Sequence, residues 1–128
     1  MGEGGRLVAC ADIDKKRAKF LADTTNATAF DDWQELLKLP EVELVFVATL
    51  HDSLAKITLA AIEAGKHIHY NKTMPTTVAG ADQIIAKAKD KGLKVVASPG
   101  QMLHPFNLRS RKHILQGDLG ALTWGQTG

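Results

Sequence analysis

Apolar residues fall into two kinds of segment that alternate along the chain. One kind is a short, continuous apolar run without a helical period, which is typical of a buried strand. The other kind repeats its apolar residues every three or four positions, which predicts a helix with one buried face. The expected strands cover residues 6–11, 27–30, 43–50, 66–71, 93–98 and 121–127, and the expected helices cover residues 14–25, 32–39, 53–65, 76–92 and 106–117.

Polar residues and glycines mark where several of these helices should begin and end. Asp14 and Ser53 precede helical segments, and their side chains can accept hydrogen bonds from the first free backbone N–H groups. Asp32 stands three residues before Glu35, which is the spacing of a capping box. Gly65 follows the third helical segment, where a left-handed backbone conformation would close the helix.

The regular alternation of strands and helices predicts an α/β fold. Continuous apolar strands and one-sided helices indicate an open, mostly parallel sheet with helices on both faces. Ligands of such sheets bind beyond the carboxyl ends of the strands. The polar and small residues expected at those ends are Asp12, Asp14, Thr49, His51, Asp52, Asn71, Lys72, Thr73, Ser98, Gly100 and Gln101.

Composition narrows the class of protein. The 128 residues are enough for one domain with a real core. Sixteen basic residues stand against 14 acidic ones, for a net charge of +2, so we expect neither a nucleic-acid partner nor a membrane partner. The start of the chain has no signal-peptide layout, and no apolar run approaches the length of a membrane helix. The single cysteine, Cys10, fits a reducing compartment such as the cytoplasm.

Asp12 ends the first expected strand and precedes a helix. In dinucleotide-binding sheets, an acidic side chain at such a strand end accepts hydrogen bonds from the adenosine ribose, and its charge favours NAD over NADP. The alternative is an ordinary turn or capping aspartate. A glycine-rich loop normally stands about 20 residues before that acid, but only 11 residues precede Asp12, and the run "GEGG" at 2–5 does not match the motif. The sequence therefore predicts a fold that lacks the first strand and its phosphate-binding loop.

Lys72 follows the fourth expected strand, in the stretch "HIHYNKTMP". Beside a ligand it could neutralise a phosphate, hold a sugar hydroxyl, or transfer a proton with a lowered pKa. The alternative is a lysine exposed to solvent, which is the usual situation of this residue type.

Other pairs of residues have ordinary structural explanations. His67 and His69 lie two apart on one face of a strand, but no third metal ligand stands nearby. His51 beside Asp52 is either a proton-transfer pair or a polar loop. A phospho-receiver domain would need a further aspartate on an intervening strand, so we hold that interpretation as the weakest.

Several stretches together resemble the glucose–fructose oxidoreductase/inositol dehydrogenase family (Gfo/Idh/MocA). "LVACADIDKKRA" resembles its second strand, ribose-binding acid and following helix. "VELVFVATLHDSLAKITLAAIEAGKHIHYNKTM" resembles the run from its A-T-P-N strand end to its E-K-P motif. "HPFNLRSRKHILQGDLGALTWGQTG" resembles the helix and G-x-x-G turn that lead into its catalytic domain. The likeness covers nearly the whole chain.

The resemblance implies an NAD(P)-dependent oxidoreductase acting on sugars, cyclitols or related polyols, with NAD as the expected cofactor and NADP possible. It implies that Lys72 is catalytic and contacts the substrate hydroxyl near the nicotinamide. The cofactor-binding residues that it implies are Asp12 at the ribose, Arg17 on the adenine side, Ala48, Thr49 and His51 along the wall of the cleft, and Asn71, Lys72 and Gln101.

The chain also departs from the family pattern. Asn71-Lys72-Thr73 replaces E-K-P, which removes a carboxylate contact to the cofactor and a proline that shapes the turn. We expect residues 1–119 to form an incomplete NAD(P)-binding domain and residues 120–128 to begin a substrate domain, whose sheet makes the contacts of a homo-oligomer in the family. We therefore expect the 128 residues alone to bind NAD weakly or not at all and to turn over no substrate. The alternative function is a non-catalytic module for cofactor sensing or subunit contact.

Overall fold

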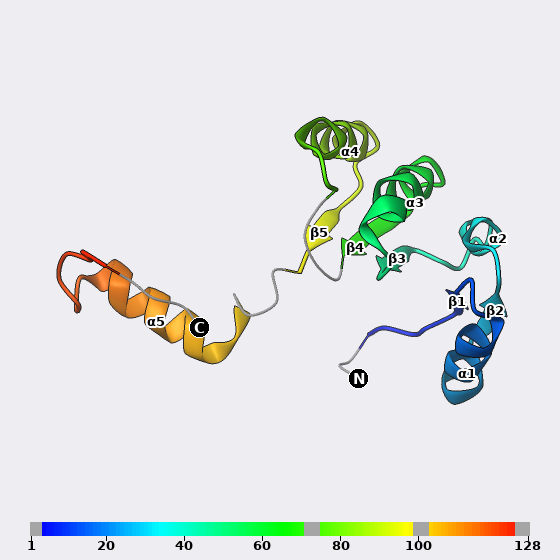
Figure 1. Cartoon of the computed structure of the whole chain (residues 1–128), viewed down its shortest axis with the longest axis horizontal. Helices are drawn as coiled ribbons and strands as arrows, with labels where there is room; N and C mark the ends of the chain where they lie inside the picture. The colour runs from blue at the N-terminus through cyan, green and yellow to red at the C-terminus, as the bar shows by residue number, and fades with distance from the viewer. Residues whose placement is uncertain (1–3, 71–74, 99–102, 125–128) are drawn as a thin grey trace. The chain divides into compact units, whose positions relative to one another are not determined.

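Five short strands and five helices alternate within residues 4–70, 75–98 and 103–124, the parts of the chain that the computed structural model describes (Figure 1). The strands are β1 (Ala9–Ala11), β2 (Thr28–Phe30), β3 (Leu44–Val47), β4 (His67–Tyr70) and β5 (Val95–Ala97). The helices are α1 (Lys15–Thr25), α2 (Trp33–Leu37), α3 (His51–Glu63), α4 (Val78–Asp90) and α5 (Pro105–Gln116). The chain divides into two compact units, residues 1–98 and 99–128.

All strand pairs in the first unit are parallel, as the alternation predicted. They form two sheets, one with the order β1-β2 and one with the order β3-β4-β5. Ala11 pairs with Phe30 at the end of the smaller sheet. Val47 pairs with Tyr70, and Tyr70 pairs with Ala97, so the three strands of the larger sheet end at one level. The residues that follow those strands therefore start from the same edge of the sheet.

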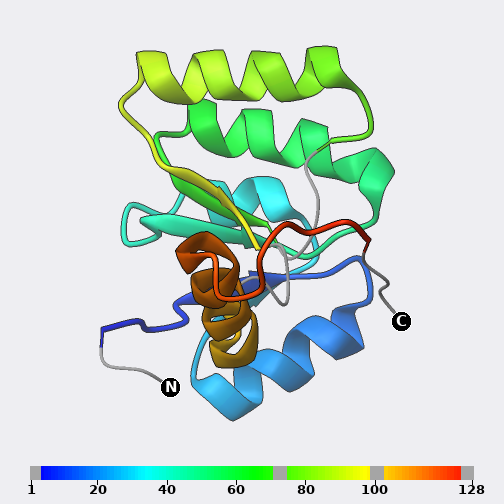
Figure 2. The same ribbon diagram turned by 90° about the vertical axis from the view of Figure 1, so that its left-hand side faces the viewer.

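Helices α3 and α4 lie next to each other against one face of the larger sheet (Figures 1 and 2). Alternate residues of the strands face these helices, and the opposite alternation leaves Leu44, Phe46 and Val96 about half exposed. Helix α2 adds Leu37 to the same core. The buried residues of this core are Leu37, Val47, Leu54, Ile57, Ala61, Ile62, Ile68, Tyr70, Ile84 and Ala88.

Two predicted helix starts hold, and in both an aspartate caps the helix. Asp14 accepts a 2.9 Å hydrogen bond from the backbone N–H of Lys16, and Asp32 accepts one of 2.9 Å from Gln34. The prediction that Ser53 caps α3 is wrong, because the helix begins at His51 and its N-cap, Leu50, has no capping side chain. The first turn starts earlier because the Ser53 N–H donates to the Leu50 carbonyl at 3.1 Å.

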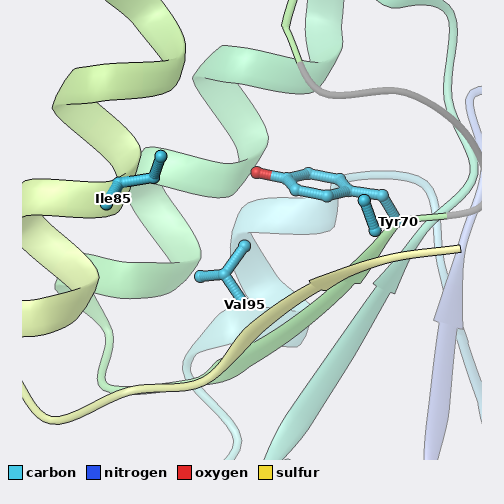
Figure 3. A pocket seen from close by; sticks show the side chains of 4 residues that line it. Tyr70, Ile85 and Val95 are labelled. Carbon is cyan, nitrogen blue, oxygen red and sulfur yellow. The ribbon is translucent and has the colours of Figure 1, made fainter.

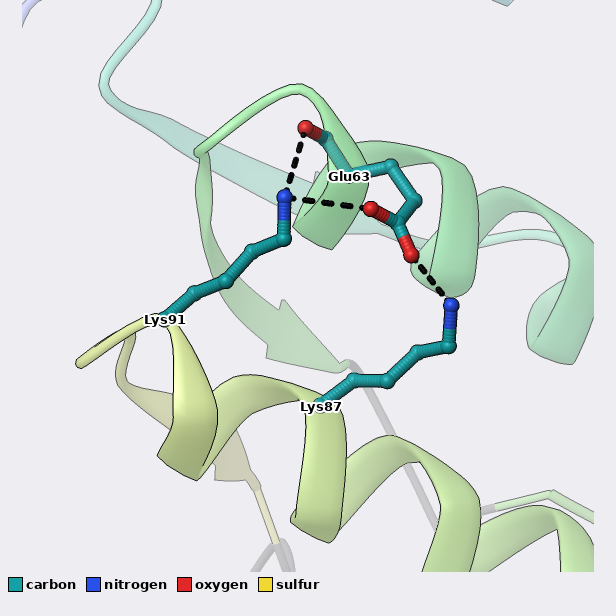
Figure 4. Close-up of polar contacts among 3 residues, drawn as sticks. All are labelled: Glu63, Lys87 and Lys91. Carbon is teal, nitrogen blue, oxygen red and sulfur yellow. Dashed lines mark hydrogen bonds and ion pairs between the residues drawn. The ribbon is translucent and has the colours of Figure 1, made fainter.

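Lysine side chains tie neighbouring elements of the first unit together. Glu63, at the end of α3, accepts hydrogen bonds from Lys87 of α4 and, at 3.0 Å, from Lys91 just beyond it (Figure 4). Lys91 also donates to the Glu63 backbone carbonyl at 3.2 Å. Lys66 is 8% exposed, and its amine donates a 2.8 Å hydrogen bond to the carbonyl of Leu39.

The second unit contains α5 and the turn that follows it. Gly117 closes α5 with a φ of 78°, in the left-handed region that suits glycine. Asp118 then reaches back to the ring of His113, with 2.7 Å between Oδ2 and Nδ1. Residues 121–124 form no strand, and the rest of the strand expected at 121–127 lies outside the described residues. None of the helices within the described ranges combines the length and apolar character needed to cross a membrane.

Candidate functional site

Asp12 is held at the carboxyl end of β1 by a tight turn. Its Oδ1 accepts a 2.8 Å hydrogen bond from the backbone N–H of Asp14. Its own N–H donates to the Phe30 carbonyl of β2 at 3.3 Å. The side chain is partly exposed, and the described residues provide no hydrogen bond to its second carboxylate oxygen, Oδ2. A fixed carboxylate with one available oxygen at a strand end fits a ribose, whose hydroxyls donate hydrogen bonds.

Two cations of the first turn of α1 follow Asp12 closely in the sequence, and each has a carboxylate partner. The Nε of Arg17 lies 3.5 Å from Oδ2 of Asp14. The amine of Lys15 lies 2.6 Å from Oδ2 of Asp31, which follows β2. The hydrogen bond to Asp31 raises the pKa of Lys15, and the same bond lowers the pKa of Asp31. Both pairs are exposed, so they shape the local charge more than they stabilise the fold.

The carboxyl end of β3 leads directly into a helix N-terminus. Ala48 and Thr49 follow the strand, and both are exposed. His51 is the first residue of α3, and Asp52 lies in its first turn. The free backbone N–H groups of a helix N-terminus carry a partial positive charge. The strand end and helix start therefore form a polar rim at this edge of the larger sheet.

The other predicted residues of the site lie outside the described part of the chain. Asn71, Lys72 and Gln101 belong to this group, and so does Thr73. β4 ends at Tyr70, whose carbonyl accepts a 3.0 Å hydrogen bond from the N–H of Ser98. Asn71 therefore follows, in sequence, a residue that is paired with the last residues of both β3 and β5.

The two strand histidines have structural roles. Nδ1 of His67 accepts a 3.0 Å hydrogen bond from the N–H of Lys94, which joins β4 to the start of β5. The ring of His69 meets Phe46 edge-on, with 4.9 Å between ring centroids. Among the described residues, no group of three metal-ligating side chains comes together.

A pocket of about 190 Å³ lies beside β5 and is lined by Tyr70, Ile85, Val95 and Ala97 (Figure 3). The ring of Tyr70 extends from β4 toward α3. Its hydroxyl is buried, as is that of Thr58, and neither makes a hydrogen bond of normal geometry with a described residue. Burial raises the pKa of Tyr70, and the nearby Thr58 hydroxyl opposes this more weakly. The walls of the pocket contain none of the predicted site residues.

The described structure gathers the predicted residues into two groups. Asp12 and Arg17 lie near the end of β1, and Ala48, Thr49 and His51 lie at the end of β3. The two groups belong to different sheets, since β1 pairs with β2 and β3 pairs with β4. Sequence reasoning missed the pair of Lys15 and Asp31: the strand expected at 27–30 places Asp31 at a strand end, but Asp31 was not counted among the polar residues of those ends.

Comparisons with known proteins give the family. Residues 1–98 match the model of an oxidoreductase family with an NAD-binding Rossmann fold, Gfo/Idh/MocA. The chain is 29% identical over 118 residues to D-xylose 1-dehydrogenase (NADP(+)) of Hypocrea jecorina, covering 90% of this chain and 30% of that protein. It is 34% identical over 96 residues to inositol 2-dehydrogenase of Pseudomonas fluorescens, covering 73% of this chain and 29% of that protein.

A solved structure shows the same arrangement. The crystal structure of an NAD binding oxidoreductase from Klebsiella pneumoniae matches with a TM-score of 0.80 and 29% identity, over 90% of this chain and 31% of that one. The chain thus spans just under a third of the length of these relatives. The parallel α/β architecture and the family match over residues 1–98 agree, and the chain belongs to the Gfo/Idh/MocA oxidoreductase family, with an NAD-binding Rossmann fold.

Proposed function

We propose that this chain is the nucleotide-binding part of an oxidoreductase that acts on a sugar, a cyclitol or a related polyol. The observation that carries the proposal is the Asp12 carboxylate, fixed through Oδ1 at the end of β1 with Oδ2 available. The names of two relatives, a xylose dehydrogenase and an inositol dehydrogenase, support a polyhydroxylated substrate. When bound, the nicotinamide cofactor supplies the hydride acceptor or donor.

In this proposal, the residues at the strand ends bind and orient the cofactor. Asp12 accepts hydrogen bonds from the adenosine ribose hydroxyls, and Arg17 lies on the adenine side. Ala48, Thr49 and His51 form a wall of the cleft, where the N-terminus of α3 favours negative charge. Asn71, Lys72 and Gln101, which follow β4 and β5 in the sequence, complete the contacts.

Lys72 is the proposed catalytic residue of this chain. An ammonium or amine at the substrate hydroxyl can hold the oxygen and move its proton as the adjacent carbon gains or loses hydride. A lysine suits this role because its pKa falls readily when water is excluded from the site. In this proposal, the remaining catalytic groups belong to a substrate domain of the complete protein, because this chain spans only 30% of the length of the xylose dehydrogenase that it resembles.

The proposal also covers the domain boundary, the oligomeric state and the cellular compartment of the enzyme. We infer that the domain boundary lies near residue 119, that the complete protein is a homo-oligomer, and that it works in the cytoplasm. The free, buried thiol of Cys10, which donates a 3.3 Å hydrogen bond to the Ala18 carbonyl, is compatible with a reducing compartment.

The test is hydride transfer by the protein encoded by the complete gene, followed through nicotinamide absorbance with a panel of aldoses and inositols. Substitution Lys72→Met should lower kcat by about 100-fold or more, since general acid–base groups contribute about that much. Lys72→Arg, which keeps the charge but cannot release a proton at neutral pH, should be nearly as inactive. Unchanged kcat in Lys72→Met would refute the catalytic role.

A second pair of substitutions tests the alternative of a non-catalytic module. In the complete protein, Asn71→Glu and Thr73→Pro together restore the usual E-K-P motif. If activity rises sharply from near zero, the natural protein is a binding or regulatory relative. If the unaltered protein already turns over a polyol, the oxidoreductase proposal stands.

A further inference from the structure

The pair of Lys15 and Asp31 connects the first turn of α1 to the end of β2. Its two atoms lie 2.6 Å apart. Ala11 and Phe30 are register partners in the parallel ladder of β1 and β2, so the next residues, Asp12 and Asp31, leave the smaller sheet side by side. Adjacent strands are about 4.8 Å apart. The backbone of Asp31 therefore lies next to that of Asp12, the proposed ribose-binding acid.

The charges around this strand end are balanced in pairs. Lys15 is engaged by Asp31, and Arg17 is engaged by Asp14. Asp12 has no cation partner among the described residues, and its Oδ1 is occupied by a backbone N–H. A neutral 2′-hydroxyl can donate a hydrogen bond to such a carboxylate. A 2′-phosphate would bring about two negative charges to the same place, where the cations nearest in sequence already have partners.

We propose that Asp31 is a specificity-determining residue that, by holding Lys15, makes the site prefer an adenosine ribose without a 2′-phosphate. This inference rests on the proposed function, because it assumes that the ribose lies at Asp12. It adds a second residue, which follows a different strand, to the acid identified from the sequence. Removing the Asp31 charge releases Lys15. It also makes the electrostatic potential less negative where a 2′-phosphate would lie.

Asp31 is a better position to test than the other carboxylates of this region. Asp14 caps α1 through the Lys16 N–H, and Asp32 caps α2 through the Gln34 N–H, so substituting either would disturb a helix. Asp31 is not a helix cap, and its side chain is 56% exposed. Asp31→Asn should therefore fold as the unaltered chain does.

The experiment uses two probes that differ only in the 2′-phosphate, 5′-AMP and 2′,5′-ADP. Each is titrated into the ¹⁵N-labelled 128-residue chain, and the amide shifts of residues 12–17 give the dissociation constants, which we expect to be millimolar. Asp31→Asn should improve the affinity for 2′,5′-ADP relative to 5′-AMP by roughly three- to tenfold, as expected for an exposed charge near a bound dianion.

Two further variants separate a local effect from a general one. Glu35→Gln makes the same change in net charge and releases Lys38 from a 2.6 Å pair on α2, so it is a matched control that should leave the affinity ratio nearly unchanged. Adding Lys15→Gln to Asp31→Asn should abolish the gain, because the released cation is then absent.

The outcomes distinguish this inference from the proposed function. An unchanged ratio in Asp31→Asn, or an equal rise in Glu35→Gln, would overturn the role of Asp31 while leaving the ribose site intact. If 5′-AMP shifts amides elsewhere in the chain but none of those of residues 12–17, the ribose does not bind at Asp12. The proposed function would then fail, and this inference with it.

Discussion

The amine of Lys66 donates a hydrogen bond to the backbone carbonyl of Leu39 across 2.8 Å, in a position that is 8% exposed. This contact fastens the segment between α2 and β3 to the turn that begins β4. Lys66→Met keeps the length of the side chain but removes the shorter of the two hydrogen bonds to the Leu39 carbonyl, which keeps only the 3.3 Å bond from the Val42 N–H. We expect the free energy of unfolding to fall by about 1–3 kcal/mol, measured by urea denaturation. Lys56→Met, at an exposed position of α3, is the control and should change the free energy of unfolding less.

The ion pairs of Glu63 should make the stability of the chain depend on pH and on salt concentration. Hydrogen bonds from Lys87 and Lys91 hold the pKa of Glu63 below its ordinary value of 4.5. Because the pKa of Glu63 is lower in the folded state than in the unfolded state, its ion pairs contribute to stability above the unfolded-state pKa. That contribution is lost as the pH falls through the folded-state pKa. Thermal unfolding of Glu63→Gln and the unaltered chain should therefore differ at neutral pH and converge in acid and at high salt. A difference that persists at low pH would contradict this explanation.

Tyr70 should produce the opposite dependence at alkaline pH. Burial raises its pKa above the ordinary value of 10.0. The contribution of the neutral Tyr70 side chain to stability is therefore present below the unfolded-state pKa. It is lost as the pH rises through the higher folded-state pKa. The unfolding midpoint should decline more steeply above about pH 10 in the unaltered chain than in Tyr70→Phe. Tyr70 is the only tyrosine, so near-ultraviolet tyrosinate absorbance reports its ionisation directly.

The same substitution tests the buried hydroxyl at neutral pH. The Tyr70 hydroxyl has no hydrogen-bond partner of normal geometry among the described residues. Removing an unsatisfied buried hydroxyl should cost little or be stabilising. Tyr70→Phe should therefore unfold at the same temperature as the unaltered chain or a higher one, and a clear loss of stability would show that the hydroxyl has a partner after all.

Local sequence signals were sufficient for most of the fold. Caps at Asp14 and Asp32 predicted helix starts correctly because the capping hydrogen bonds involve only residues two positions away. The apolar runs predicted parallel strands because both residue type and connection length favour them. Ser53 misled the prediction for α3, since a helix can begin without a capping side chain when its first turn is held by backbone bonds, as at Leu50.

The candidate site was less predictable because its contacts join distant segments. Asp12 was found from its place after a strand, a property of the sequence alone. Lys15 and Asp31 become partners only because β1 and β2 pair in one particular register, which the weak strand at 28–30 did not specify. The division into two sheets also depends on which strands pair, and apolar periodicity carries no information about strand order.

The most direct test of the central claim is a titration of the ¹⁵N-labelled chain with NAD⁺, because the claim concerns where the cofactor lies rather than how tightly it binds. We expect weak binding, with amide shifts concentrated at Asp12, Ala48 and Thr49, where β1 and β3 end. Shifts concentrated instead at the opposite ends of the strands, around Leu44 and His67, would contradict the proposed cofactor site.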